Sequence, residues 1–507
     1  MPDSFPLRVA AIDIGSNAIR FIAAEFTQPG RYAILDQKRS PVRLGHDVFL
    51  TGTLTPEAIA AAAQVLAGYR ERLDTLDIEH HRAVATSAVR DSRNGANLIE
   101  AATRAGIHIE TITGAEEARL AHLAVRSRID LGRRRWMTAD LGGGSVEVSI
   151  VDHHAIYWSE SAGMGSVRLL EELAVSGDDP ERFRRRLEEY TATLRIPVSH
   201  ARLAGFIATG GNIEALARLA GTPVDARGVG RLRTSELRRI IETLARLSYQ
   251  ERMHELGLRP DRADVILPAS MVYERLASLA GADEILVPFV GIKDGIVLDL
   301  AEEIIPLHGS RVERLEHTAV AGALALGRRY RFDAAHGRHV ADLASALFDQ
   351  LHEIHGLSRE DRRLLIVAAM LHDVGTFISH RRHHKHSHYI ISESDLPGMT
   401  QQEKAIVANV ARYHRKTPPA PHHDAYMRLE ERDRIRVERL SAILRVADAL
   451  DRERRQNVSR VRAIVRDSRV SLDVDGSGDL LLERWALETS AAPLFEKAFG
   501  LELRMNS

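Results

Sequence analysis

The sequence contains no cysteine. This excludes disulfide bonds, thiolate zinc sites, iron–sulfur clusters and a cysteine nucleophile. Because this absence suits a reducing compartment, we expect a cytoplasmic protein. The first residues carry no basic segment followed by an apolar one, so we expect no signal peptide. No apolar run approaches the roughly 18 residues that a membrane-spanning helix needs, which argues against a membrane partner.

An excess of charge of either sign is also missing. The 69 Lys and Arg residues nearly balance the 70 Asp and Glu residues, for a formal net charge of −1. We therefore expect no specific nucleic-acid partner, although the balance is compatible with local basic patches. Aromatic residues make up only 5% of the chain, but the hydrophobic fraction of 44% is sufficient for several cores. At about 150 residues per domain, 507 residues suggest roughly three or four domains.

The first half of the chain alternates between short apolar runs and amphipathic stretches. The runs are rich in strand-forming residues and end in glycine-containing or polar turns, and the stretches between them have helical periodicity. This alternation predicts an α/β fold in which helices cover the sheets. The expected strands are 9–14, 83–86, 137–139, 206–208 and 285–287, and the clearest helices are 56–73 and 116–125.

From about residue 311 strand patterns disappear and helical periodicity continues to about residue 451. Segments 338–352, 362–371 and 440–450 are expected helices. The last 50 residues change again and predict a small α+β fold. Its expected parts are a strand at 470–476 with a hairpin partner at 480–483, a helix at 485–499 and a closing strand at 501–504. We thus expect four domains: α/β lobes at 1–135 and 136–308, a helical domain at 309–455 and an α+β domain at 456–507.

One short pattern occurs twice in the first half. Asp13 and Asp140 each end an apolar run, are followed by a glycine-containing turn, and precede a second β-rich run. Such a repeat predicts two related lobes, each presenting one glycine-rich hairpin turn to a shared cleft.

Turns of this kind are suited to phosphate. Without side chains in the way, their backbone N–H groups can approach a polyanion closely. A carboxylate beside phosphates is favourable when Mg²⁺ lies between them, which makes Asp13, Asp140 and Glu147 candidate metal or water-positioning residues. A third site is the Gly-Gly start of an expected helix, where the helix dipole favours an anion. The candidate phosphate-binding residues are Gly15, Ser16, Asn17, Gly142, Gly143, Gly144, Ser145, Gly210, Gly211 and Asn212.

These turns resemble those of the actin, sugar-kinase and chaperone-ATPase superfamily, whose lobes are ribonuclease H-like. Within it, the chain resembles the exopolyphosphatase/guanosine pentaphosphate phosphatase family over about residues 1–300. The matching stretches, in order, are 12–17, 85–90, 113–120, 140–145 and 209–212. One departure is Ala18, where the family commonly has a hydroxyl residue. A further glycine turn at 163–168 ends in Arg168, which faces either an anion or the surface.

The resemblance implies roles for three residues. The second Glu of the family's Gly-x-Glu-Glu-Ala-Arg motif is catalytic, and Glu117 occupies that position, so we expect it to be the general base. Glu116 is then a surface residue or a support for the site. Arg90 is expected to hold the terminal phosphate through both guanidinium nitrogens. The alternatives are a charged first helical turn for Glu116 and Glu117, and a surface position for Arg90.

The second half contains a different set of candidate residues. Histidine is abundant, with 24 in the chain and five between His380 and His388. The pair His372-Asp373 ends an apolar helix, where uncompensated polar groups are costly. Imidazole and carboxylate ligands suit Mn, Fe, Mg or Zn. The order His339, His372-Asp373, Asp448 resembles the HD phosphohydrolase superfamily, and members with additional histidines hold two metals.

For the second metal we expect His386 and His414, with His388 as the rival to His386. The role of the domain is open between a second hydrolase, a regulatory nucleotide site and a metal-stabilised structure. The basic run at 381–385 is expected either to form a solvated loop or to guide a polyanion.

The resemblance implies a Mg²⁺-dependent exopolyphosphatase that removes terminal phosphate from polyphosphate. The alternative is a guanosine pentaphosphate 5′-phosphatase, with guanosine penta- and tetraphosphate as partners, or an enzyme with both activities. The long C-terminal half favours polyphosphate, because a processive enzyme needs surface beyond its catalytic lobes. An actin-like ATPase, a sugar kinase and a non-catalytic sensor are less consistent with the Glu-Glu-Ala-Arg motif. The family commonly forms homodimers, so we expect one here.

Overall fold

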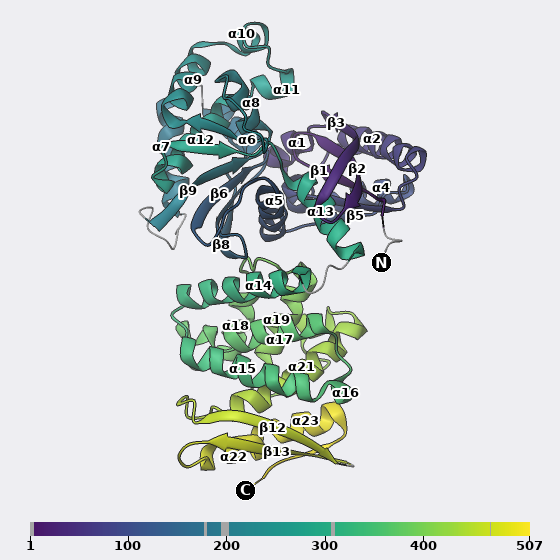
Figure 1. Ribbon diagram of the computed structural model, residues 1–507, viewed down its shortest axis with the longest axis vertical. Coiled ribbons are helices and arrows are strands. Elements are labelled where there is room, and N and C mark those ends of the chain that lie inside the picture. The colour runs from purple at the N-terminus through teal and green to yellow at the C-terminus, as the bar shows by residue number, and fades with distance from the viewer. Residues whose placement is uncertain (1–4, 177–179, 194–201, 306–309, 467, 507) are drawn as a thin grey trace. The chain divides into compact units, whose positions relative to one another are not determined.

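Figure 1 shows a computed structural model of the protein. The structure describes residues 5–176, 180–193, 202–305, 310–466 and 468–506. The chain divides into two compact units, Met1–Arg314 and Leu315–Ser507, which we call the first and the second unit and describe separately.

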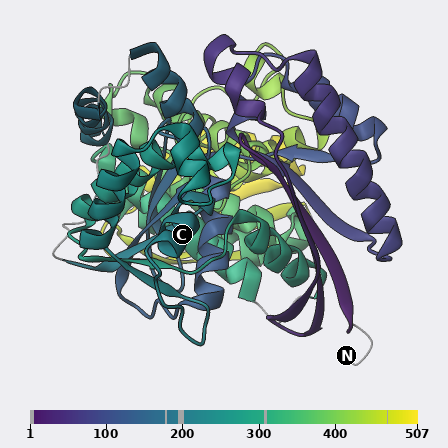
Figure 2. The same cartoon turned by 90° about the horizontal axis from the view of Figure 1, so that it is seen from above.

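The first unit contains two lobes, each built around a mixed sheet. The first sheet has the order β3-β2-β1-β4-β5, in which β1 pairs antiparallel with β2 and parallel with β4. In Figure 2 its long antiparallel strands are purple, and the teal helices of the second lobe lie beside them. The strands are β1 (Leu7–Ile14), β2 (Ile19–Gln28), β3 (Arg31–Ser40), β4 (His80–Ala85) and β5 (Ile109–Thr111).

Helices cover the first sheet on both faces, which explains the nearly continuous apolar sequence of β1. All its residues except Arg8 are buried. Ile12 and its neighbours on one face pack against α2 (Pro56–Thr75) and α4 (Gly95–Arg104). The other face packs against α5 (Gly114–Arg128) and α13 (Ile292–Ile304). Two short helices, α1 (Leu44–Thr51) and α3 (Ser87–Asp91), complete this lobe.

The second sheet has the order β10-β11-β9-β6-β7-β8. Its strands are β6 (Arg135–Leu141), β7 (Val146–Val151), β8 (Ile156–Ala162), β9 (Leu203–Thr209), β10 (Gly230–Arg233) and β11 (Glu284–Val287). The helices are α6 (Ser166–Ser176), α7 (Pro180–Thr193), α8 (Gly211–Leu219), α9 (Thr234–Arg246), α10 (Tyr249–His254), α11 (Pro260–Ala263) and α12 (Ile266–Ala280).

The predicted α/β class and the two related lobes are confirmed. The expected strands coincide with β1, β4, β6, β9 and β11, and the expected helices with α2 and α5. The hairpins β1–β2 and β6–β7 are equivalent, because Asp13 pairs with Arg20 in one and Asp140 with Glu147 in the other. Helix α13 follows the second sheet in sequence but packs against the first. The boundaries at 135 and 308 remain predictions.

The second unit is helical up to its C-terminal part (Figure 1). Helix α14 (Ser310–Arg329) leads into it. The others are α15 (Ala334–Gln350), α16 (His352–His355), α17 (Arg359–Leu371), the 3-10 helix η2 (Val374–Phe377), α18 (His383–Ser392), α19 (Gln401–Arg412), α20 (Asp424–Met427) and α21 (Glu431–Ala449).

The small C-terminal sheet differs from its prediction in one pairing. The partner of β13 (Arg469–Gly476) is β12 (Val458–Arg466), which the sequence analysis missed, and not segment 480–483. That segment begins helix α22 (Leu481–Ala486), whose first N–H is capped by Asp479. Three arginines obscure the strand pattern of β12, in which only Val458 and Val461 are buried.

The remaining C-terminal elements follow the prediction. The expected helix is present as α22, a π-helical turn (Leu487–Ala491) and α23 (Ala492–Phe499), and β14 (Glu502–Met505) closes the sheet in parallel with β13.

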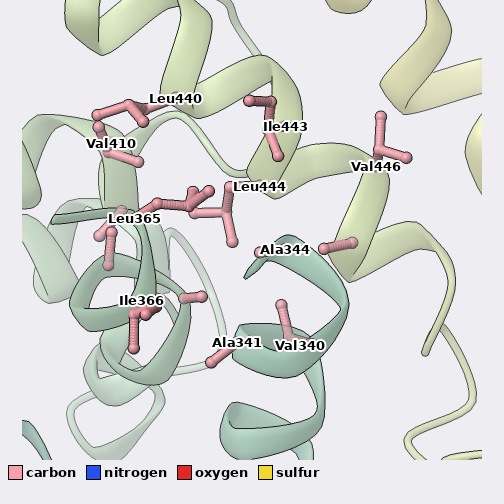
Figure 3. Packing of buried hydrophobic residues seen from close by; sticks show 14 of the residues in the cluster. Val340, Ala341, Ala344, Leu365, Ile366, Val410, Leu440, Ile443, Leu444 and Val446 are labelled. Atoms are coloured by element: carbon pink, nitrogen blue, oxygen red, sulfur yellow. The ribbon is translucent and has the colours of Figure 1, made fainter. Parts of the chain in front are cut away.

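One apolar core runs through the second unit. Figure 3 shows its helical part, where Val340 and Ala344 of α15 meet Leu365 of α17 and Ile443 and Leu444 of α21. The same cluster includes buried residues of β13 and α23, so the helices and the small sheet share a core. The boundary at 455 remains a prediction. No helix within the described residues has the length and apolar character needed to cross a membrane.

Candidate functional site

The first glycine turn lies between β1 and β2. It is closed by a hydrogen bond from the Gly15 backbone N–H to the Ala18 carbonyl, 3.2 Å. Asp13 is buried and accepts a 2.8 Å hydrogen bond from the Nη1 atom of Arg20 on the opposite strand. Ser16 Oγ lies 3.1 Å from Ser87 Oγ at the start of α3.

The second glycine turn, between β6 and β7, carries two buried carboxylates. Asp140 accepts a short hydrogen bond from the Thr209 hydroxyl. Glu147 accepts a 2.8 Å bond from the Ser161 hydroxyl through Oε1, but its buried Oε2 has no hydrogen-bond partner. Burial, with the Asp140 charge, raises the pKa of Glu147 to about 7.

Glu117 lies in the first turn of α5, which begins at the N-cap Thr113. Only 4% of Glu117 is exposed, and its Oε1 accepts a 2.6 Å hydrogen bond from Arg90 Nη1. Arg90 also donates to the Ile112 carbonyl, 2.7 Å away. Burial and the nearby Glu147 carboxylate raise the pKa of Glu117 well above its usual value. The site therefore contains a poorly solvated carboxylate beside a guanidinium, which suits a group that accepts a proton near neutral pH.

Glu116 was expected either on the surface or as a support for the site. It is not on the surface, so the first expectation is wrong. It is buried and paired with Arg119, with an Nε–Oε2 distance of 2.7 Å, and with Arg82 at 3.2 Å. Arg119 also binds Asp299 of α13 at 2.7 Å. This buried network ties α5 to α13 and β4, and therefore supports the segment that carries Glu117.

The third glycine site is the start of α8. Asn212 donates a 3.1 Å hydrogen bond to the Ser166 hydroxyl and accepts a short one from Arg262. A side chain at Gly211 would meet the Arg262 guanidinium at 2.6 Å, so glycine makes room for this arginine at the helix N-terminus. Sequence analysis missed Arg262, since nothing in its own segment indicates a binding residue.

Arg262 is an uncompensated cation. It is 8% exposed, and within the described part of the chain no carboxylate lies at ion-pair distance from it. Burial and the neighbouring Arg20, Arg259 and Arg39 lower its pKa to about 10. A buried positive charge with a helix N-terminus beside it is suited to binding an anion.

These elements surround a cavity of about 620 Å³. Of the predicted residues, the lining includes Asp13, Gly15, Ser16, Asn17, Glu117, Asp140, Gly142, Gly143, Ser145, Gly210, Gly211 and Asn212. It also includes cationic residues that the sequence analysis did not select, namely Arg20, Lys38, Arg39, Arg218, Arg259, Arg262 and Lys293. The cavity is suited to a polyanion with several phosphates, because acidic groups and cations lie along one space.

Arg90, Gly144 and Glu147 are not among the residues that line the cavity, but Arg90 binds the lining residue Glu117, and Glu147 is the cross-strand partner of the lining residue Asp140. A side chain at Gly144 would meet the Phe49 ring at 2.3 Å and the Ser87 hydroxyl at 2.4 Å, so this glycine serves close packing. Arg168, expected at an anion or at the surface, instead donates to the Gly144 carbonyl, to Asp91 at 2.6 Å, and stacks over Phe49.

The second unit brings six of its titratable residues together. We call them the His/Asp cluster: His336, His372, Asp373, His383, His414 and Asp448. Asp373 Oδ1 lies 2.9 Å from His383 Nε2 and 3.5 Å from His414 Nε2. Asp448 Oδ1 lies 3.4 Å from the Nε2 atoms of both His336 and His372. Two groups, which share Asp373, have the spacing of a metal site.

In each of the four histidines of the cluster, the hydrogen-bond partner of Nδ1 fixes the direction in which Nε2 points. The Nδ1 atoms of His372 and His414 each lie 2.6 Å from a backbone carbonyl, and that of His383 lies 3.0 Å from one. His336 Nδ1 lies 2.8 Å from Asp451. When neutral and donating through Nδ1, each of these imidazoles directs the lone pair of Nε2 to the centre, as metal-bound histidines do.

Two predicted ligands differ from those that the structure brings together. His339 and His386 do not belong to the His/Asp cluster, whereas His336 and His383 do. His336 lies one turn before His339 on α15, and His383 begins α18 three residues before His386. His388 is also outside the cluster. His383 and His384 are buried, so the basic run at 381–385 is only partly solvated.

The charges in the cluster are tightly paired. Burial lowers the pKa of His336, but hydrogen bonds to Asp448 and Asp451 outweigh it and raise that pKa to about 9. Burial raises the pKa of Asp448, but the imidazoles of His336 and His372 hold it well below its usual range.

Comparison with known proteins agrees with this geometry. The model of the Ppx/GppA phosphatase family matches residues 24–304, which is more than half of the chain. The chain belongs to the Ppx/GppA phosphatase family. A second model, Ppx/GppA phosphatase domain III, matches residues 320–490.

Among relatives of this Ppx/GppA protein, exopolyphosphatase 2 of Mycobacterium tuberculosis is 34% identical over 58% of this chain and 98% of its own length. The guanosine-5′-triphosphate,3′-diphosphate pyrophosphatase of Aliivibrio fischeri is 24% identical over 94% of this chain and 93% of its own. A crystal structure of an exopolyphosphatase from Cytophaga hutchinsonii has a TM-score of 0.55 at 26% identity, covering 58% of this chain and 98% of its own. The Aquifex aeolicus PPX-GPPA enzyme has a TM-score of 0.50 at 28% identity, covering 58% and 99%.

Membership in this family shows which kind of reaction the protein catalyses. It is a phosphoanhydride hydrolase with actin-like lobes, as the glycine turns predicted. The His/Asp groups of its second unit are arranged so that they could hold a metal. The relation of that unit to the HD superfamily remains a prediction.

Proposed function

We propose that this Ppx/GppA protein is an exopolyphosphatase that hydrolyses the terminal phosphate of inorganic polyphosphate processively. One observation carries the proposal: a single cavity joins buried carboxylates, glycine turns and the cations of β3, α8 and the 256–262 segment. A polyphosphate chain needs cations spaced along its length, and phosphoryl transfer needs neutralisation at its end. The relative named exopolyphosphatase 2 supports the same substrate.

In this mechanism Glu117 accepts the proton of the attacking water. Its raised pKa brings the carboxylate close to the basicity that a general base needs near neutral pH. Arg90 keeps Glu117 in position and can place a second guanidinium nitrogen on the terminal phosphate. The backbone N–H groups of the two glycine turns and of α8 hold the phosphate oxygens, with Arg262 beside them.

The carboxylates fit Mg²⁺. Asp140 and Glu147 are cross-strand partners, Asp13 occupies the equivalent place in the other hairpin, and the buried Oε2 of Glu147 lacks a partner. Oxygen ligands of this kind are those that Mg²⁺ prefers. Asp13, Asp140 and Glu147 would hold the ion, which when bound neutralises the negative charge on the phosphates and orients them.

A second candidate function is removal of the 5′-phosphate of guanosine pentaphosphate, alone or in addition. The observation in its favour is the match of the guanosine-5′-triphosphate,3′-diphosphate pyrophosphatases to nearly the whole chain, including the second unit. Both substrates would use the same carboxylates and turns.

The test is orthophosphate release with Mg²⁺, offering long-chain polyphosphate and guanosine pentaphosphate to the same preparation. Glu117→Gln is compared with Glu57→Gln, which changes an exposed carboxylate of α2. Faster release from polyphosphate that Glu117→Gln abolishes supports the proposal. Faster release from the guanosine nucleotide selects the second function, and undiminished release by Glu117→Gln contradicts the assigned base.

We propose further that the His/Asp cluster binds divalent metal, with Mn, Fe, Mg and Zn as candidates. The support is geometric: His336 Nε2 and His372 Nε2 are 3.2 Å apart, and so are His383 Nε2 and His414 Nε2. Facing lone pairs at that distance require a cation or a proton between them. Metal analysis of the purified full chain tests this directly.

Two further expectations stay with the proposal. We propose that the enzyme is a cytoplasmic homodimer, which light scattering coupled to size-exclusion chromatography and cell fractionation test. We also retain the four domain boundaries, and limited proteolysis would test those at 308 and 455.

A further inference from the structure

Asp299 of α13 lies in the middle of the buried network that supports α5. Only 1% of it is exposed, so its negative charge depends on the cations around it. Among the described residues, Arg119 reaches its carboxylate at 2.7 Å, Arg82 at 3.2 Å and Arg311 at 3.3 Å. Arg119 and Arg82 also bind Glu116, so their positive charge is divided between two carboxylates. Arg311 supplies Asp299 with the charge that this division leaves short.

The Nη2 atom of Arg119 serves both carboxylates at once. It lies 2.9 Å from Glu116 Oε1 and 2.7 Å from Asp299 Oδ2. While Arg311 helps to neutralise Asp299, Arg119 can stay between the two. Without Arg311 the buried charge of Asp299 is less compensated, and we expect Arg119 to move toward it and away from Glu116.

A displacement of Glu116 reaches the proposed general base directly. Glu116 and Glu117 are consecutive residues in the first turn of α5, and the Glu116 backbone N–H donates to the hydroxyl of the N-cap Thr113 at 3.1 Å. The next turn of α5 cannot absorb the movement, because a side chain at Gly295 of α13 would meet the Leu120 carbonyl at 2.0 Å. A change in the network therefore changes the direction of the Glu117 carboxylate in the cavity.

Arg311 comes from the segment that joins the two units of the chain. It lies in the first turn of α14, between the ranges 24–304 and 320–490 that the two family models match. One turn later, Arg314 forms a short ion pair with Glu302 of α13, so the start of α14 is held on α13 at two points. The same helix continues into the second unit. The cation that completes the network thus lies outside the matched phosphatase range.

We infer that Arg311 is a positioning residue for phosphate release. It compensates Asp299 and thereby leaves Arg119 free to hold Glu116 and the carboxylate that follows it. Arg311 is not among the residues that line the cavity, so it acts on the turnover step and not on substrate binding. The inference rests on the proposed role of Glu117 as the general base.

The experiment measures kcat and KM of the full chain with Mg²⁺, on whichever of polyphosphate and guanosine pentaphosphate wild type hydrolyses faster. The variants are Arg311→Gln, Arg311→Lys and the matched control Arg328→Gln, an exposed arginine near the end of the same helix. We expect Arg311→Gln to lower kcat about three- to thirtyfold and to leave KM within about twofold of wild type, because a misplaced catalytic group slows the reaction without weakening binding. Arg311→Lys keeps the charge and should recover most of the loss, and Arg328→Gln should equal wild type.

Glu116→Gln provides a readout that a general loss of stability would not change. If Arg311 acts through Glu116, the two substitutions are not independent, and Arg311→Gln should lower kcat by less than about twofold when Glu116→Gln is already present. All rates are measured below the unfolding transition of every variant, so that loss of folded protein does not contribute. An equally large loss with and without Glu116→Gln would overturn the inference.

Glu117→Gln in the same assay separates the inference from the proposal beneath it. If Glu117→Gln abolishes release while Arg311→Gln equals wild type, the inference is wrong and the assigned base stands. If Glu117→Gln releases phosphate at the wild-type rate, the assigned base is wrong and the inference fails with it.

Discussion

Arg90 and Glu117 form an ion pair in which the guanidinium Nη1 lies 2.6 Å from Oε1 of the buried carboxylate. The pair joins the end of the β4–α3 segment to the first turn of α5, two regions that the sequence places far apart. Arg90 and the other surroundings of Glu117 have opposite effects on the charge of this carboxylate. Arg90 favours the charged form of Glu117 and orients it, whereas burial and Glu147 make that charge costly, so Glu117 as the proposed base would be both fixed and reactive.

Glu117→Gln should leave the fold intact and reduce kcat by about 10²–10⁴-fold, the usual contribution of a general base. The amide oxygen can still accept the bond from Arg90, and the repulsion from Glu147 disappears, so we expect a melting temperature equal to or above that of wild type. Phosphate release and thermal unfolding on the same sample check this. A melting temperature that falls together with kcat would assign Glu117 a structural role instead.

Arg90→Gln should shift the acidic limb of the kcat/KM profile to higher pH. Arg90 lowers the pKa of Glu117, so without it that pKa rises further and the carboxylate is populated only in more alkaline solution. A pH–rate profile measures the shift, with Arg93→Gln, an exposed arginine after α3, as the control. An unchanged limb in Arg90→Gln would mean that another group titrates.

Gly165→Ala and Gly163→Ala form a matched pair in one turn. A side chain at Gly165 would meet the Gly144 backbone at 2.2 Å, whereas one at Gly163 would make only a 3.7 Å contact with Arg168. We expect Gly165→Ala to destabilise the protein by about 1–3 kcal/mol and to lower phosphate release, because the second glycine turn must move. Gly163→Ala should do neither. Chemical denaturation and activity assays on both variants decide the point, and equal effects would contradict the packing argument.

The glycine turns could be predicted from sequence because their function depends on residue type at fixed local spacing. Asp13 and Asp140 recur in the same strand–turn–strand pattern, and their strands follow from continuous apolar runs. The cations of the cavity could not be predicted in this way. Arg20 reaches Asp13 only across the hairpin, and Arg262 reaches Asn212 only because α11 packs near α8 in the fold.

The His/Asp cluster shows a different limit of prediction from sequence. The helices around it, the pair His372-Asp373 and the residues His414 and Asp448 were identified from the sequence, and the structure brings these residues together. However, His336 and His339 lie on neighbouring turns of one helix, and the local sequence does not show which of them is the metal ligand. The choice depends on Asp451, which binds His336 from a segment more than a hundred residues away.

The buried network of α5 predicts how stability depends on pH. Burial raises the pKa values of Asp299 and Glu116, but Arg119 outweighs it and holds both below their usual range. Both carboxylates therefore stabilise the fold fully above their unfolded pKa of about 4, and this contribution is lost as the pH falls below that value.

The matching variant is Asp299→Asn, which removes the buried counter-charge of Arg311 and one of the two buried counter-charges of Arg119, whose pair with Glu116 remains. We expect a loss of about 3–5 kcal/mol at neutral pH and a shallower decline of stability between pH 5 and 3 than in wild type. Denaturation curves across that range measure both quantities. A parallel decline in the two proteins would show that other carboxylates control acid unfolding.

His336→Gln and His339→Gln test which histidine of α15 belongs to the metal site. His336 Nε2 lies 3.2 Å from His372 Nε2 and 3.4 Å from Asp448, whereas among the described residues His339 belongs to no group with the spacing of a metal site. Both side chains lie on the same helix, so the two changes have similar effects on helix propensity. We expect His336→Gln to reduce Mn²⁺ affinity at the cluster by about 10–100-fold, and His339→Gln to leave it within about twofold of wild type. Metal titration of the full chain measures both, and a larger loss for His339→Gln would restore the ligand that the sequence pattern selected.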